Sequence, residues 1–167
     1  MIKLRALEPE DLDALYELEN DRAEWESGTS NVPFSRYALH DYIAHNSYDI
    51  YADKQLRQAV ELNGTVVGLV DIVNFDPRNG RAEVSIITVK EYRRKGIATQ
   101  SLAHIIEYAR DFLHLHQLYA IVPENNVASI GLFQKLNFMH TSTLQSWIAN
   151  GKEMQNAMFF QLILKKD

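Results

Sequence analysis

Three strand-like segments separated by two short polar turns constrain the fold of this chain more than any other feature of its sequence. The segments are Arg57–Leu62, Thr65–Phe75 and Arg81–Val89, and valine, isoleucine and leucine are frequent in them. The turns are Asn63-Gly64 and Asp76–Gly80, and both have residues typical of β-hairpins. The three segments therefore predict an antiparallel meander.

Flanking segments complete the pattern of an α+β domain. A strand at Ile2–Leu7 precedes a helix from Pro9 to Glu24, since proline suits the first turn of a helix. The further expected elements are a loop at Glu26–Phe34, helices at Ser35–Asn46 and Lys95–Leu113, a strand at Gln117–Val122, a mostly helical segment at Glu124–Phe138, and two strands, His140–Ala149 and Glu153–Leu164, paired across Asn150-Gly151. This order predicts a single domain over residues 1–167, with a mixed, mostly antiparallel sheet of six to seven strands and helices on both faces.

The composition narrows the classes of function. The 167 residues include no cysteine, which excludes disulfides, thiolate metal sites and a cysteine nucleophile. The net charge of −5 disfavours nucleic-acid binding and suits a small cationic substrate. The sequence has neither a signal-peptide pattern nor an apolar run of roughly 20 residues, so we expect a cytoplasmic protein that does not enter a membrane.

A basic cluster lies where the last strand of the meander is followed by a helix. Arg93–Lys95 directly precede Gly96-Ile97-Ala98. Backbone N–H groups at a helix N-terminus lack intrahelical partners and carry partial positive charge, and glycine allows a ligand to approach closely. Such a loop suits a phosphate or pyrophosphate, although a charge run of this kind also occurs as a solvated turn. The P-loop and Rossmann motifs, GxxxxGK[ST] and GxGxxG, are both absent.

Two motifs together resemble the GNAT superfamily of acetyl-CoA-dependent N-acetyltransferases. Arg93–Ala98 matches the family signature Gln/Arg-x-x-Gly-x-Gly/Ala between the fourth strand and the third helix. Asn126–Phe138 (NVASIGLFQKLNF) is similar to the family's Asn-x-x-Ser/Ala block, which ends in Tyr-x-x-x-Gly-Phe. The stretches IKLRALEPEDL, GLVDIVNFDPRNGRAEVSI and EYRRKGIAT look most like bacterial spermidine N-acetyltransferases, with ribosomal-protein N-terminal acetyltransferases close behind.

The resemblance implies acetyl-CoA as co-substrate, bound at a splay between the fourth and fifth strands. The amides of residues 94–99 would bind the pyrophosphate, and the backbone of residues 87–89 would hold the pantetheine arm. Asn126 would contact the pantetheine or acetyl region, and Lys135 would reach the nucleotide phosphate. The residues assigned to the co-substrate in this way are Ile87, Thr88, Val89, Arg93, Arg94, Lys95, Gly96, Ile97, Ala98, Thr99, Asn126, Ser129, Phe133 and Lys135.

One residue departs from the family pattern at a position of chemical importance. Where the family often has a tyrosine that protonates the leaving thiolate, this sequence has Phe133, which cannot donate a proton. Three explanations remain open: the thiolate leaves with help from water or another group, Tyr119 takes over the role, or the enzyme is slow or inactive on ordinary amines. The family glycine before the final Phe138 is Asn137, a mild change because asparagine tolerates positive φ.

Glu83 is the leading candidate for the base that removes a proton from the amine. The two-residue period of a strand places Glu83, Ser85 and Ile87 on one face of the strand that would flank the acetyl group. The alternative is a surface charge paired with Arg81 or Arg78.

An acidic stretch in the N-terminal region is the second candidate for contacts with the acceptor. Carboxylates beside an aromatic wall suit a cationic amine, so Trp25 and Glu26 are predicted to bind the substrate. Glu17, Glu19 and Asp21 are interpreted as a solvated helix face.

These residues predict an N-acetyltransferase that moves an acetyl group to a primary amine by direct attack. A polyamine or other small cationic amine is the expected acceptor; a protein N-terminus, or coenzyme A binding without turnover, is the alternative. Related polyamine enzymes imply a homo-oligomer, a dimer or higher. His114 and His116 lack a nearby cysteine or acidic pair, so no metal is expected.

Overall fold

A seven-stranded sheet forms the centre of the computed structural model, which describes residues 1–25 and 32–165. The strands are β1 (Ile2–Arg5), β2 (Leu56–Leu62), β3 (Thr65–Asp76), β4 (Arg81–Thr88), β5 (Gln117–Pro123), β6 (Met139–Asn150) and β7 (Glu153–Ile163). Their spatial order is β1-β2-β3-β4-β5-β7-β6, and every neighbouring pair is antiparallel except β4 and β5. The predicted mixed, mostly antiparallel sheet is confirmed.

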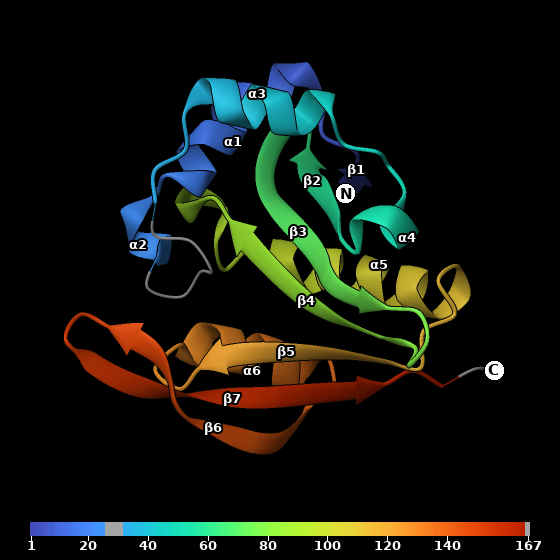
Figure 1. Cartoon of the computed structure of the whole chain (residues 1–167), viewed down its shortest axis with the longest axis vertical. Coiled ribbons are helices and arrows are strands. Elements are labelled where there is room, and N and C mark those ends of the chain that lie inside the picture. Colours follow the sequence, from blue (N-terminus) through green and yellow to red (C-terminus); the bar gives the residue numbers. More distant parts are fainter. Residues whose placement is uncertain (26–31, 166–167) are drawn as a thin grey trace.

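Helices cover both faces of this sheet, as predicted (Figure 1). The helical segments are η1 (Pro9–Asp11), α1 (Leu12–Glu19), α2 (Arg22–Trp25), α3 (Arg36–Ala44), α4 (Ile50–Asp53), η2 (Lys90–Tyr92), α5 (Ile97–Asp111) and α6 (Val127–Lys135). On one face, α1 and α3 bury Leu15 and Leu39 against Leu69 of β3. On the other face, α5 and α6 pack against a larger apolar cluster that includes Leu102 and Phe160. Removal of these side chains from water is the main stabilising contribution to the fold.

The central meander is present with both of its predicted turns. Asn63 and Gly64 have φ values of 51° and 81°, as a tight hairpin turn requires. A bulge between Val60 and Glu61 shifts the β2–β3 register by one residue. On β3, a Cβ atom at Gly68 would lie 2.4 Å from the carbonyl oxygen of Ile87, so only glycine allows β4 to pass this closely.

The N-terminal helical region is shorter and more broken than the sequence predicts. Instead of one helix from Pro9 to Glu24, η1 leads into α1, which ends at Glu19, and α2 begins separately at Arg22. The reason is Asn20, whose side chain accepts from the Phe34 amide at 2.8 Å and donates to the Phe34 carbonyl at 3.1 Å. This pair of hydrogen bonds ties the end of α1 to the start of the segment that leads into α3.

Two short helical segments, α4 and η2, were not predicted. Asp49 caps α4 by accepting from the Tyr51 amide at 2.9 Å, and Tyr51 packs edge-to-face on Phe75 of β3. The hairpin of β6 and β7 across Asn150-Gly151 is confirmed. Within residues 1–25 and 32–165, no helix has the length and apolar character needed to cross a membrane.

Candidate active site

The two parallel strands in the middle of the sheet separate shortly after they meet. β4 and β5 pair only at Arg81–Gln117, Ala82–Leu118 and Glu83–Tyr119 within the described residues. Both strands then continue, and Figure 1 shows them diverging toward the left of the view. The predicted splay is therefore present. Its closed end lies at Glu83.

A cleft of about 810 Å³ occupies this part of the molecule. Its walls come from α1, α2, β2, the second half of β3, the middle of β4, the second half of β5, α6 and β6. The described residues that line it include Glu19, Glu24, Trp25, Arg57, Asp71, Asn74, Glu83, Ile87, Asn126, Ser129, Phe133 and Trp147. A cleft of this size, built from several elements, is suited to an organic ligand.

Glu83 lies half-buried in this cleft without a cationic partner among the described residues. Arg81, the alternative partner considered from the sequence, pairs with Asp76 instead, at 3.4 Å. Burial raises the pKa of Glu83, and a hydrogen bond from the Asn74 side chain partly offsets this effect. A carboxylate with a raised pKa is a stronger base than an exposed one. Because no described cation pairs with Glu83, its negative charge is available to an incoming ammonium group.

Tyr119 lies next to Glu83 on β5, since the two residues are register partners. Its ring stacks on Phe159, with centroids 5.2 Å apart. Burial and the Glu83 carboxylate raise the pKa of Tyr119, so the phenol keeps its proton at neutral pH. Tyr119 does not itself line the cleft as described, so the structure places it beside the closed end of the splay rather than in its open part.

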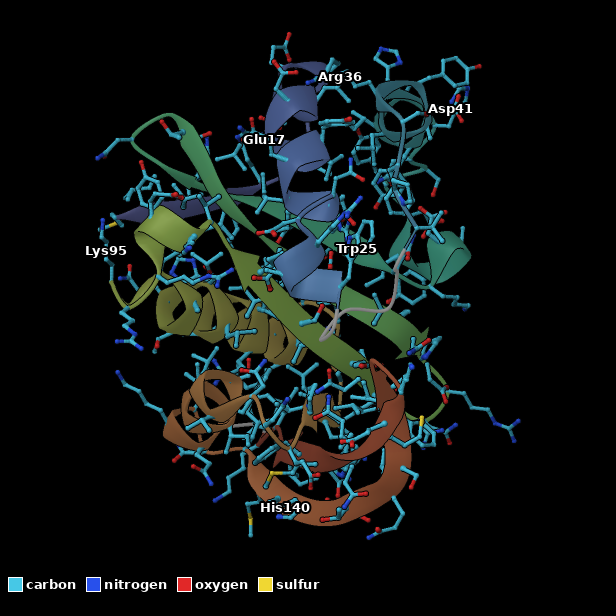
Figure 2. All side chains as sticks on the ribbon, turned by 90° about the vertical axis from the view of Figure 1, so that its left-hand side faces the viewer. Glu17, Trp25, Arg36, Asp41, Lys95 and His140 are labelled. Carbon is cyan, nitrogen blue, oxygen red and sulfur yellow. The ribbon has the colours of Figure 1, made fainter. Side chains whose placement is uncertain are left out.

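The basic loop has the backbone geometry of an anion site. Gly96 precedes α5 with φ 78°, Arg94 has φ 60°, and no described side chain caps the helix N-terminus. Two of the three cations are already engaged: Arg93 pairs with Glu24 and donates from Nε to the Thr88 carbonyl at 3.0 Å, while the Lys95 ammonium lies 5.0 Å from the Tyr92 ring centroid. In Figure 2, Lys95 lies at the edge of the molecule, in the loop leading into α5. Ala98 and Thr99 follow in the first turn of α5, after Ile97.

The predicted residues of α6 divide between the cleft and the surface. Asn126 caps the helix by accepting from the Ser129 amide at 3.1 Å, and both residues line the cleft. Phe133, one turn further, is 4% exposed and packs on Phe138 and Phe160 while forming part of the cleft wall. Lys135 is exposed at the end of α6. Thr88 is the last residue of β4 and Val89 follows it, and neither is among the described residues that line the cleft.

The part of the cleft lined by α1 and β2 contains a charge cluster that the sequence analysis missed. Arg57 of β2 donates to both oxygens of Asp71, at 2.7 and 2.9 Å, and also pairs with Glu19. The interpretation of Glu19 as part of a solvated face is therefore wrong, whereas Glu17 and Asp21 are exposed as expected. Burial alone would lower the pKa of Arg57, but the surrounding carboxylates raise it. The sequence signal that could have indicated this cluster is one charged residue, Arg57 and Asp71, in each of two neighbouring predicted strands.

Trp25, predicted to form an aromatic wall for the acceptor, lines the cleft. Its indole Nε1 donates to the Glu19 carbonyl at 3.1 Å, which fixes the ring beside the cleft. Figure 2 shows Trp25 at the C-terminal end of the blue helical region. The other predicted acceptor residue, Glu26, lies outside the described residues. Glu24 also lines the cleft.

Comparison with known proteins gives a family to this arrangement. The model of the acetyltransferase (GNAT) domain matches residues 2–139, which is most of the chain. The chain belongs to the GNAT acetyltransferase family. This acetyltransferase is 32% identical to spermidine N(1)-acetyltransferase of Escherichia coli K12 over 159 residues, covering 90% of this chain and 80% of the relative. It is 26% identical to YdaF, a provisional ribosomal N-acetyltransferase of Bacillus subtilis, over 99% of this chain and 92% of that one.

The fold of the acetyltransferase is also that of a solved relative. The crystal structure of spermidine N-acetyltransferase from Vibrio cholerae in complex with CoA and spermine has a TM-score of 0.88, with 24% sequence identity, 98% coverage of this chain and 95% of the other. As a member of the GNAT acetyltransferase family, the chain uses acetyl-CoA as acetyl donor. The uncapped N-terminus of α5, the positive φ of Gly96 and the splay fit a molecule with a pyrophosphate and an extended arm. No group of three or more potential metal ligands occurs among residues 1–25 and 32–165.

Proposed function

We propose that this acetyltransferase modifies a primary amine of a small cationic molecule, with a polyamine as the leading class. The observation that carries this proposal is Glu83, a half-buried carboxylate without a described cationic partner at the closed end of the splay. Among the other described carboxylates that line the cleft, Glu19 and Asp71 share one guanidinium, Arg57, whereas Glu24 pairs with Arg93, so Glu83 and the Arg57 cluster together leave an excess of negative charge. An ammonium group would compensate this negative charge.

Each residue has a defined part in the proposed reaction. Acetyl-CoA supplies the thioester, which is the activated form of the acetyl group. Glu83 accepts one proton from the ammonium and so produces the neutral nucleophile, directly or through a water molecule. Amides of β4 in the open part of the splay donate to the developing oxyanion. The bond from nitrogen to the acetyl carbon forms and the carbon–sulfur bond breaks. The nitrogen passes its second proton, through water, to the sulfur or to the group that protonated it, and Glu83 releases the first proton to solvent. The products are an N-acetylamine and the free thiol.

The proton for the leaving sulfur is assigned to Tyr119 or water, because Phe133 has no hydroxyl group. Tyr119 keeps its proton at neutral pH and lies beside Glu83. The alternatives to a small amine are a protein N-terminus, supported by the likeness to YdaF, and coenzyme A binding without turnover, supported by Phe133. We further propose a homo-oligomer, since a spermidine N-acetyltransferase of the same fold from Vibrio cholerae is dodecameric.

The deciding experiment measures thiol release from acetyl-CoA against spermidine, spermine, diamines, an aminoglycoside and basic peptides, with calorimetric titration of coenzyme A in parallel. We expect turnover on a small polyamine and a loss of that turnover in Glu83→Gln. Preference for peptides would replace the small-amine proposal with the protein N-terminal one. Binding of coenzyme A with no turnover on the whole panel would contradict the catalytic proposal.

A further inference from the structure

The irregular end of strand β3 places one side chain directly on the proposed base. β3 pairs regularly with β4 up to Val73–Glu83, and pairing resumes only at Asp76–Arg81. Asn74, in this bulge, has φ 50°, a left-handed conformation that asparagine tolerates better than most residues. Bulges next to active sites commonly redirect a side chain.

The two residues of the bulge point to opposite sides of the sheet. Phe75 is 3% exposed, belongs to the large core cluster and packs against Tyr51 with ring centroids 5.2 Å apart. Asn74 lines the cleft on the other face, together with Glu83. The buried Phe75 therefore anchors the bulge, and the anchored backbone presents Asn74 to the cleft.

In the hydrogen bond between Asn74 and Glu83, the amide is the donor and the carboxylate is the acceptor. Asn74 Nδ2 donates to Glu83 Oε2 at 2.9 Å. An ionised carboxylate only accepts hydrogen bonds, so the amide must present its nitrogen here and its oxygen elsewhere. This bond favours the ionised form of Glu83, and no other described side chain donates to that carboxylate. Oε1 is thus the oxygen that remains to receive a proton.

We propose that Asn74 is a positioning residue for the reaction: it holds Glu83 Oε2, keeps the carboxylate ionised and directs Oε1 to the ammonium group of the acceptor. This inference rests on the proposed function and deepens it. The proton moves from the ammonium nitrogen to Oε1, and the hydrogen bond from Nδ2 to Oε2 is kept throughout. Asn74 itself exchanges no proton with the substrate.

Two variants separate this role from a merely structural one. Asn74→Gly removes the amide and accepts the positive φ, whereas Asn74→Asp keeps the side-chain size but replaces the donor with a second carboxylate. For the amine that shows turnover, we expect the acidic limb of the kcat/KM profile to move to higher pH in both variants, further in Asn74→Asp. On the acidic limb kcat/KM should fall about tenfold or more, as for loss of a hydrogen bond to a charged group, and it should remain close to wild type on the alkaline plateau.

Asn79→Asp is the matched control, because Asn79 belongs to the exposed turn that follows the same bulge and bonds to Asp76 instead. It should leave the limb in place. An equal fall of kcat/KM at all pH values in the Asn74 variants, with an unmoved limb, would overturn the inference.

A second measurement needs no turnover at all. The ¹³C carboxyl resonances of labelled glutamate are titrated by NMR, and Glu83→Gln identifies the Glu83 signal. We expect Glu83 to titrate at higher pH in Asn74→Gly than in wild type. Unchanged titration refutes the role of Asn74 even if an amine is acetylated, whereas the expected titration without turnover on any amine supports the contact and rejects the proposed function.

Discussion

Replacing Arg57 tests whether the charge cluster of Arg57, Asp71 and Glu19 stabilises the fold. Arg57→Met removes the guanidinium and leaves Asp71 and Glu19 facing each other without their shared cation. The side chains of Arg57, Asp71 and Glu19 are 25%, 12% and 19% exposed, so water screens the remaining charges only in part. Loss of one partner from a buried ion pair costs about 3–5 kcal/mol, and the partial exposure here places the cost near the lower end of that range.

This cost predicts a measurable change in melting temperature. A loss of about 3 kcal/mol corresponds to a fall in Tm of roughly 6–12 °C for a domain of this size. The matched control is Arg36→Met, since Arg36 pairs with Asp13 on the surface and the two side chains are 53% and 82% exposed. Figure 2 shows Arg36 at the periphery of the helical layer. An exposed pair contributes about 0.2–1 kcal/mol, so the control should lose less than about 4 °C.

Differential scanning calorimetry of both variants gives the comparison. The double variant Arg57→Met with Asp71→Leu should recover part of the loss, because an apolar neighbour replaces a buried carboxylate that would otherwise be unpaired. Equal Tm values for Arg57→Met and Arg36→Met would refute the reasoning. A double variant with a lower Tm than Arg57→Met alone would refute it as well.

Three further changes test the site. Glu83→Gln should lower kcat/KM by about 10²–10⁴-fold in the thiol-release assay. Wild-type activity should fall as pH decreases through the raised pKa of Glu83, because a protonated carboxyl group cannot accept a proton. Activity unchanged by Glu83→Gln would assign the base elsewhere. Phe133→Tyr should raise kcat by up to about 10²-fold, since it adds a phenol to the cleft wall; an unaltered kcat would show that another group protonates the sulfur. Gly96→Ala forces a φ of 78° on a residue with a Cβ atom, which costs about 1–2 kcal/mol of conformational free energy. The affinity for coenzyme A, measured by calorimetry, should therefore fall. Undiminished affinity would contradict the anion-site geometry.

Most elements of the sheet were predictable because local sequence determines them. Asn63-Gly64 and Asn150-Gly151 both form hairpin turns with the expected partners. By contrast, α4 contains only four residues, Ile50–Asp53, and such a segment has no helical period to detect. Its position depends on packing against Phe75, which is distant in sequence.

The charge cluster and the positioning residue were not predictable because both depend on bulges. A regular two-residue hairpin at Asn63-Gly64 would place Arg57 opposite Val70, but the bulge at Val60 and Glu61 places it opposite Asp71. In the same way, the sequence pattern predicts Asn74 to be an ordinary residue of a strand that ends at Phe75. An extra residue in a strand changes no local pattern, and only the register across the sheet shows it.

The short pairing of β4 with β5 has a consequence for how the sheet is held together. Within the part of the chain that the structure describes, three residue pairs join β1–β4 to β5–β7, so the facing edges beyond these pairs offer peptide groups to water or to a bound molecule. A ligand in that opening acts as an interstrand partner and adds hydrogen bonds between two halves that already share one apolar core. The stability of the sheet is thus a joint property of chain and ligand. Amide hydrogen exchange in β5 and β7 should slow on binding to a degree that contacts at the ligand alone would not produce.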